Sequence, residues 1–284
     1  MGEAKVAIVV DSTAYIPEEL VKQYNMHVIP LHVNWAGKSL RDNVDIKPDE
    51  FYKKLVEAKE LPTTSQPSAG EFYDFYSELA QTADQIISLH ISSELSGTVA
   101  SAHAAAKLMD DFPVEIVDSY STSMGLGFMA MAAARALEQG ADYKEAANVA
   151  RSIIPGMNVV FAVDTLEFLH RGGRIGGAQR FFGSMLSIKP LLQLDDGRIE
   201  ALEKVRTKRK AVQRLLEIGA ESAANAGKVY AAVAHAASHA EAESLAAQVK
   251  DQLQPAELYV VELSPVIGTH TGPGALGLAW YTEP

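Results

Sequence analysis

Strands and helices are expected to alternate along the first half of the chain, and this pattern constrains the fold more than any other sequence feature. Short apolar runs rich in β-branched residues lie within 5–10 and 85–91, each followed by a polar turn and a helical segment. Such alternation is typical of a mainly parallel sheet with helices on both faces. The sequence therefore predicts an N-terminal α/β domain at residues 1–155.

The pattern changes after Pro155 and Gly156. The extended segments 190–194 and 199–205 flank Asp195-Asp196-Gly197, a turn sequence that favours a β-hairpin and therefore antiparallel pairing. We predict that a second domain, of the α+β class, spans residues 156–284.

Hydroxyl-rich loops follow three strands of the predicted parallel sheet, at residues 11–13, 92–98 and 118–123. In sheets of this kind, the loops that leave the carboxyl ends of the strands form the ligand crevice. We therefore expect a ligand to bind at this edge of the first domain.

Ser96, Gly97 and Thr98 lie between a predicted strand and a predicted helix. Free backbone N–H groups and the positive end of the helix would favour an anion there. The simpler alternative is that Ser96 only caps its helix, a common role for serine. Capping alone explains Thr64 and Ser65, which precede Gln66-Pro67, equally well.

At the centre of the segment 164–190, Arg171 and Arg174 are interleaved with four glycines, and both flanks are apolar. Glycines let a backbone approach a partner closely, and arginine offers a planar fork of donors that suits a carboxylate or phosphate. The segment predicts that the protein handles an anion. Alternatively, Arg171 and Arg174 could cap carbonyls or pair with surface acids such as Glu167. His270, between two threonines, is either a donor to an anion or an ordinary loop histidine.

Composition and motifs exclude several classes of function. The net charge of −11 argues against binding to nucleic acid or to an anionic membrane. The chain has no cysteine, its eight histidines are scattered without a metal-binding motif, and no metal or cofactor is expected. The glycines at 272–277 fit a dinucleotide fingerprint but leave no room for its helix, and no serine lies in a hydrolase G-x-S-x-G motif. The N-terminus lacks the features of a signal peptide, so we expect a cytoplasmic protein.

Seven motifs taken together resemble the DegV family of bacterial fatty-acid-binding proteins, and they run in order through nearly the whole chain. They are DSTAYIP at 11–17, TTSQPSAGEF at 63–72, ISSELSGT at 91–98, VDSYSTSMGLG at 117–127, HRGGRIGGAQ at 170–179, KVRTKRKA at 204–211 and GTHTGPGALGL at 268–278. The resemblance implies one fatty acid buried between an N-terminal α/β domain and a C-terminal α+β domain. It implies a lipid-binding carrier without catalytic residues, metal or cofactor.

The resemblance also implies roles for individual residues. The carboxylate would be held by hydroxyls of the TSQP and LSGT loops and by a histidine near the C-terminus. An arginine of the GRIGGA loop would lie at the head group. The matching positions are Thr64, Ser65, Ser96, Gly97, Thr98, His270 and Arg174. Family members that serve a fatty acid kinase present the carboxylate to a separate ATP-binding subunit, for phospholipid synthesis and with at most transient membrane contact. Arg206, and less securely Arg171, match the partner contact.

Two other functions remain open from the residues alone. The protein could be an acyl hydrolase or transferase with Ser96 as nucleophile and His270 as base, although no carboxylate is placed to orient that histidine. It could also bind a small anion or a nucleotide. Under the carrier hypothesis, apolar side chains after residue 160 would line part of a tunnel, although each alone is better explained as plain core. The candidates are Phe161, Leu166, Phe168, Phe181, Phe182, Met185, Leu186 and Ile188.

Overall fold

A computed structural model describes residues 4–223 and 227–283, without the side chains of residues 183–187. The chain divides into two compact units. The first contains the residues up to His32 together with Thr64–Pro155, and the second contains Val33–Thr63 together with the residues from Gly156 onward. This division differs from the predicted domains 1–155 and 156–284 in residues 33–63, which belong with the C-terminal half.

The first unit is built on a four-stranded parallel sheet, as the alternation of elements predicts. Its strands are β1 (Val6–Asp11), β2 (Met26–Ile29), β6 (Gln85–His90) and β7 (Val114–Asp118), in the order β2-β1-β6-β7. Both faces of β1 are buried, because Ala7 and Val9 pack on one face while Ile8 and Val10, which alternate with them, point to the other. A continuous apolar strand in a parallel sheet requires a helical layer on each side.

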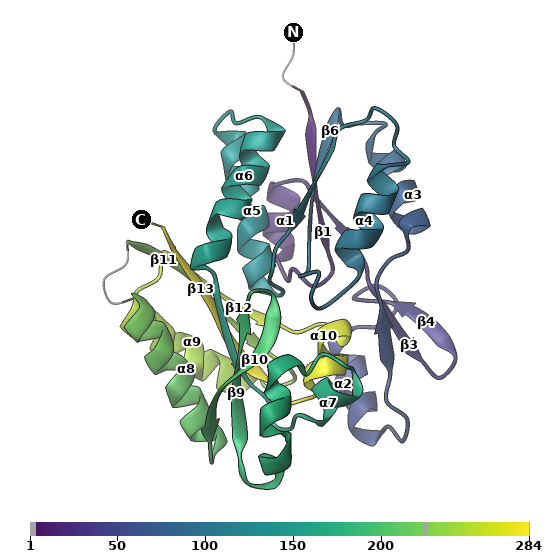
Figure 1. Ribbon diagram of the computed structural model, residues 1–284. Helices are drawn as coiled ribbons and strands as arrows, with labels where there is room; N and C mark the ends of the chain where they lie inside the picture. The colour runs from purple at the N-terminus through teal and green to yellow at the C-terminus, as the bar shows by residue number, and fades with distance from the viewer. Residues whose placement is uncertain (1–3, 224–226, 284) are drawn as a thin grey trace. The chain divides into compact units, whose positions relative to one another are not determined.

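Helices supply both layers (Figure 1). They are α1 (Glu18–Gln23), α3 (Ala69–Leu79), α4 (Thr98–Ala106), α5 (Met124–Glu138) and α6 (Tyr143–Ile153). The α3 and α4 helices bury Phe72, Tyr76 and Val99 against one face of the sheet, and α5 and α6 lie on the other side. The spacing of Ser68 and Glu71 in the sequence predicts a capping box, and the structure confirms it, since Ser68 Oγ accepts from the Glu71 N–H and the Glu71 carboxylate accepts from the Ser68 N–H.

The second unit is built on a six-stranded mixed sheet of order β10-β9-β8-β13-β11-β12. The strands are β8 (Asn158–Ala162), β9 (Lys189–Asp195), β10 (Arg198–Val205), β11 (Lys228–His235), β12 (Glu257–Glu262) and β13 (Leu276–Glu283). The predicted hairpin is confirmed, since β9 and β10 pair antiparallel around Asp196 and Gly197. The helices α8 (Lys208–Ala223) and α9 (His239–Leu253) lie side by side on this sheet (Figure 1) and bury Leu215 and Leu245 in its core.

Shorter elements carry four of the candidate site residues, Thr64, Ser65, Arg171 and His270. The shorter elements are β3 (His32–Trp35), β4 (Lys38–Arg41), α2 (Pro48–Glu57), β5 (Thr63–Ser65), the 3-10 helices η1 (Ile154–Gly156) and η2 (Gly176–Ser187), α7 (Glu167–Arg171) and α10 (Pro265–Thr271). The strands β4, β3 and β5 form a small sheet in that order, and the chain passes from one unit to the other within β3 and β5.

Candidate ligand-binding site

Ser96 does not cap α4, so the capping interpretation of this serine is wrong. The N-cap residue is Gly97, which has no side chain that could accept a hydrogen bond from the helix. The Ser96 hydroxyl instead lies 2.8 Å from the hydroxyl of Thr98. Two hydroxyls therefore adjoin the first turn of a nine-residue helix whose leading backbone N–H groups receive no side-chain cap. This is an arrangement that can donate several hydrogen bonds to an anion.

The segment that carries Thr64 and Ser65 reaches the same loop. Thr64 and Ser65 end the strand β5 and do not cap a helix, because that role belongs to Ser68. The following residue, Gln66, lies against Gly97 so closely that a Cβ atom on Gly97 would be 2.7 Å from Gln66 Nε2. The structure thus brings residues 64–66 and the loop 92–98 together, with the side chain of Gln66 against Gly97.

A second polar cluster lies in the second unit, around His270 on α10. Arg174 Nη1 donates to the carbonyl of Gly172 at 2.8 Å. The alternative that Arg174 caps a backbone carbonyl is therefore observed for one of its donors. Gly172 packs directly on the imidazole of His270, and a methyl group at Gly172 would overlap Nδ1. The glycine of this loop is therefore needed for close approach to the histidine, while its carbonyl orients the arginine.

His270 is a neutral side chain at neutral pH. It is 9% exposed, and its burial, with the charge of Arg174 as a second cause, lowers its pKa to about 4. A neutral imidazole carries one N–H donor and one acceptor nitrogen. His270 can therefore donate a hydrogen bond to an anion without a second buried positive charge beside Arg174.

Arg171 and Arg206 lie in different surroundings from Arg174. Arg171 is exposed and pairs with Glu167 at 2.7 Å, one turn earlier on α7, which is the surface-pair alternative that the sequence left open. Arg206 is exposed and follows directly after β10. Within the described residues, no ion pair involves Arg206, so its guanidinium is available at the surface.

Residues 33–63 supply two side chains that hold α10 in place and that the sequence did not indicate. The buried carboxylate of Asp42 accepts from Ser264 Oγ at 2.7 Å and from the Val266 N–H at 3.1 Å, at the start of α10. Tyr52 Oη donates to the Leu263 carbonyl at 2.9 Å. No local pattern could reveal these bonds, since Asp42 lies 222 residues from Ser264 along the chain.

Of the proposed tunnel residues, Leu166 and Phe181 are buried, while Phe161, Phe168, Phe182 and Ile188 are half-buried. Met185 and Leu186 are not among the residues whose side chains the structure describes. Phe182 stacks on His170 with ring centroids 4.4 Å apart, and the ring of Phe181 is covered by the Lys204 ammonium group. The assignment of these side chains to a tunnel stays a prediction.

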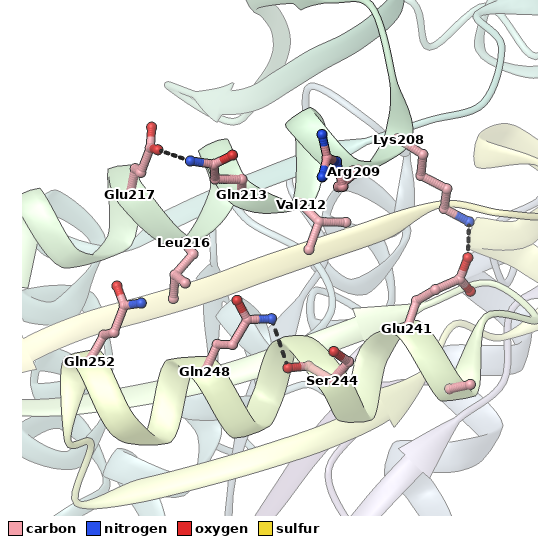
Figure 2. Close-up of a pocket in the computed structure, with 11 residues that line it drawn as sticks. Lys208, Arg209, Val212, Gln213, Leu216, Glu217, Glu241, Ser244, Gln248 and Gln252 are labelled. Atoms are coloured by element: carbon pink, nitrogen blue, oxygen red, sulfur yellow. Dashed lines mark hydrogen bonds and ion pairs between the residues drawn. The ribbon is translucent and has the colours of Figure 1, made fainter.

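A surface groove of about 910 Å³ runs between α8 and α9 (Figure 2). Its floor is apolar at Val212 and Leu216, and an ion pair of 2.9 Å joins Lys208 to Glu241 across one end. The groove contains none of the predicted site residues. Over residues 4–223 and 227–283 we find no histidine–carboxylate group arranged to hold a metal ion and no helix that could cross a bilayer.

A family model described as an uncharacterised protein of the DegV family matches residues 5–283. The chain belongs to the DegV family. A DegV domain-containing protein of Streptomyces coelicolor is 44% identical to it over 275 residues, which make up 96% of this chain and 97% of the relative. The resemblance inferred from the seven motifs is therefore confirmed.

Solved DegV structures share the fold described above. One is the structure of a DegV family protein from Thermus thermophilus, which is described as showing fatty acid binding. It matches with a TM-score of 0.93 and 38% identity over 98% of this chain and 100% of that one. Another, DegV of Bacillus subtilis, described as a fatty acid binding protein, matches with a TM-score of 0.92 and 37% identity over 99% of this chain and 100% of that one. The predicted α/β fold of the DegV type is confirmed.

Proposed function

We propose that this DegV protein binds one long-chain fatty acid and presents its carboxylate to a separate ATP-dependent kinase subunit, which forms the acyl phosphate. The fatty acid binding described for the two solved relatives supports the ligand class. In this chain, the main support is the pair of adjoining hydroxyl loops at the start of α4, where Gln66 meets Gly97.

The proposed donors to the carboxylate are neutral or singly charged. They are the hydroxyls of Thr64, Ser65, Ser96 and Thr98, the backbone N–H of Gly97, the imidazole of His270 and the guanidinium of Arg174. A buried carboxylate must be matched by hydrogen bonds, because an unpaired buried charge is strongly unfavourable. Local donors of this kind allow a chain of net charge −11 to hold an anion against its overall field.

The acyl chain supplies most of the proposed affinity. Each buried methylene contributes roughly 0.8 kcal/mol, so a chain of about 16 carbons outweighs the head group. The half-buried aromatic side chains Phe161, Phe168 and Phe182 are the proposed contacts of the acyl chain.

Arg206 is the proposed contact with the kinase subunit, and Arg171 is the weaker candidate. The support for Arg206 is a local concentration of positive charge in an otherwise acidic protein: residues 204–210 contain Lys204, Arg206, Lys208, Arg209 and Lys210. Such a segment suits an acidic protein surface or the phosphates of ATP. An ATP-dependent partner would place the protein in the cytoplasm, with no membrane contact beyond a transient one.

The alternative of an acyl hydrolase gains no support from the geometry at Ser96. A serine nucleophile needs a base within hydrogen-bond reach, and the bond described for the Ser96 hydroxyl is to Thr98. A serine-reactive phosphonate and an ester substrate discriminate the two functions. The carrier proposal requires no adduct and no turnover.

Ser96→Ala is expected to weaken fatty acid binding about tenfold, because a hydrogen bond to a charged group contributes about 1.5–3 kcal/mol. The measurement is a titration of delipidated protein with a fatty acid series. Ser93→Ala is the matched control, since Ser93 is an exposed serine of the same loop. Parent-like affinity in Ser96→Ala would show that the head group lies elsewhere.

Arg206→Ala is expected to leave fatty acid affinity within about twofold of the parent and to slow phosphorylation by the kinase subunit at least about tenfold, as for a hot-spot arginine. Arg198→Ala, at an exposed arginine outside residues 204–210, serves as the control. Loss of the lipid in Arg206→Ala would instead assign this arginine to the binding pocket.

A further inference from the structure

Four buried polar side chains form a continuous hydrogen-bonded series inside the first unit. Tyr76 Oη donates to Ser88 Oγ at 2.8 Å, Ser88 Oγ lies 2.7 Å from His90 Nε2, and His90 Nδ1 lies 3.2 Å from Asp11 Oδ2. All four residues are 0% exposed. They come from α3, β6 and β1, and we call them the buried relay.

The direction of the hydrogen bonds in the buried relay follows from its two ends. An ionised Asp11 carboxylate only accepts, so His90 Nδ1 must carry a proton. Because the Tyr76 hydroxyl donates to Ser88, the Ser88 hydroxyl is free to donate to an unprotonated His90 Nε2. With a neutral His90, each side chain of the buried relay therefore has a matching hydrogen-bond donor or acceptor.

The order serine, histidine, aspartate is that of a hydrolase triad, but the buried relay cannot act as one. A nucleophile must meet its substrate, and Ser88 lies within β6 with no exposed surface. Its hydroxyl oxygen also already accepts from Tyr76. The buried relay must therefore serve the structure around Asp11.

Asp11 fixes the base of the loop that carries Ser96. Its Oδ2 atom accepts from the Ile91 N–H at 2.8 Å, and its Oδ1 atom accepts from the N–H and the hydroxyl of Thr13 at 3.0 and 2.6 Å. Ile91 is followed by Ser92, whose carbonyl accepts from the Ser96 N–H at 3.1 Å. The carboxylate of Asp11 thus ties the end of β1 to the start of the loop.

We propose that His90 is a positioning residue for the head-group site: by orienting Asp11, it sets the geometry of residues 91–98 and so the affinity for the fatty acid carboxylate. The effect on affinity rests on the proposed function, whereas the ordering of the loop does not. The imidazole of His90 bonds to Asp11 on one side and to Ser88 on the other, and of these two partners Asp11 is the one bonded to the loop, at the Ile91 N–H, so the His90–Asp11 bond matters for binding and the His90–Ser88 bond does not.

Two substitutions of His90 separate these bonds. In His90→Asn the amide nitrogen takes the place of Nδ1 and keeps donating to Asp11, while in His90→Gln the amide oxygen takes the place of Nε2 and keeps only the hydrogen bond that it accepts from Ser88. We expect His90→Gln to accelerate amide hydrogen exchange at residues 92–98 about tenfold and to weaken fatty acid binding about tenfold, the effect of one lost hydrogen bond to a carboxylate. His90→Asn should stay within about twofold of the parent in both measurements.

Equal behaviour of the two variants would overturn the proposal, because both lose the imidazole ring and each keeps a different one of its two hydrogen bonds. Ser88→Ala provides the test if His90→Gln does not fold: it keeps the bond to Asp11, and about a tenfold loss of affinity or loop protection in it would also overturn the proposal. If the parent binds no fatty acid but the exchange rates differ as expected, the proposed function fails while His90 is confirmed as the residue that orders the loop.

Discussion

Gly172→Ala is expected to lower the affinity for a long-chain fatty acid on the order of a hundredfold, the largest effect on binding that we expect from a single methyl group. The added Cβ atom would overlap His270 Nδ1, and the carbonyl of the same residue holds Arg174 at 2.8 Å. His270 has little room to move aside, because its side chain is buried and the helix that carries it is held at its start by Asp42 and Tyr52. The substitution therefore disturbs both proposed head-group donors of the second unit.

Gly156→Ala is the matched control for this prediction, since a Cβ atom at Gly156 meets nothing within 4 Å. Titration of the two delipidated variants with the same fatty acid gives the comparison, with circular dichroism to confirm that both are folded. Parent-like affinity in Gly172→Ala would remove His270 and Arg174 from the proposed site.

Asp42→Ala is expected to lower the free energy of unfolding of the second unit by about 3 kcal/mol, the largest effect on stability that we expect. Asp42 is 1% exposed, and its removal leaves the Ser264 hydroxyl and the Val266 N–H without their buried acceptor. Each unsatisfied buried donor costs about 1–3 kcal/mol. The loss should appear in urea unfolding, and amide exchange should rise along α10.

Asp45→Ala provides the comparison for Asp42. The Asp45 carboxylate accepts from the guanidinium and from the N–H of Arg41 at 2.9 Å, but both residues are exposed, so water can replace these bonds when the carboxylate is removed. We therefore expect parent-like unfolding in Asp45→Ala. If Asp42→Ala were equally mild, the attachment of residues 33–63 to α10 would not depend on this carboxylate.

The regular elements could be predicted from the sequence because their signals are local. The β9–β10 hairpin follows from Asp195-Asp196-Gly197, and the start of α3 from the spacing of Ser68 and Glu71. These patterns act within a few residues, so a single sequence contains all the information that they need.

The sequence-based predictions fail where a residue distant in the sequence determines the local structure. No local pattern in residues 267–274 predicts a helix, yet α10 (Pro265–Thr271) forms because Pro265 stands in its first turn and Asp42 accepts from the Val266 N–H. Ser96 was a reasonable cap by spacing, but the helix begins one residue later, behind Gly97.

One feature of the sequence does indicate the buried relay. Ser88 and His90 are two polar residues, two apart, in the strand β6, whose other buried residues are apolar. Buried polar groups require partners, so this pattern predicts a polar network even though it does not identify Asp11 and Tyr76. The candidate head-group residues, in contrast, were found through family motifs, and their individual roles stay predictions.

Mass spectrometry of the organic extract from freshly purified, denatured protein tests the central proposal most directly. We predict about one long-chain fatty acid per chain, with the preferred chain length and unsaturation read from the same spectrum. An empty extract, together with no binding when a fatty acid series is added back, would contradict the carrier function while leaving the DegV fold in place.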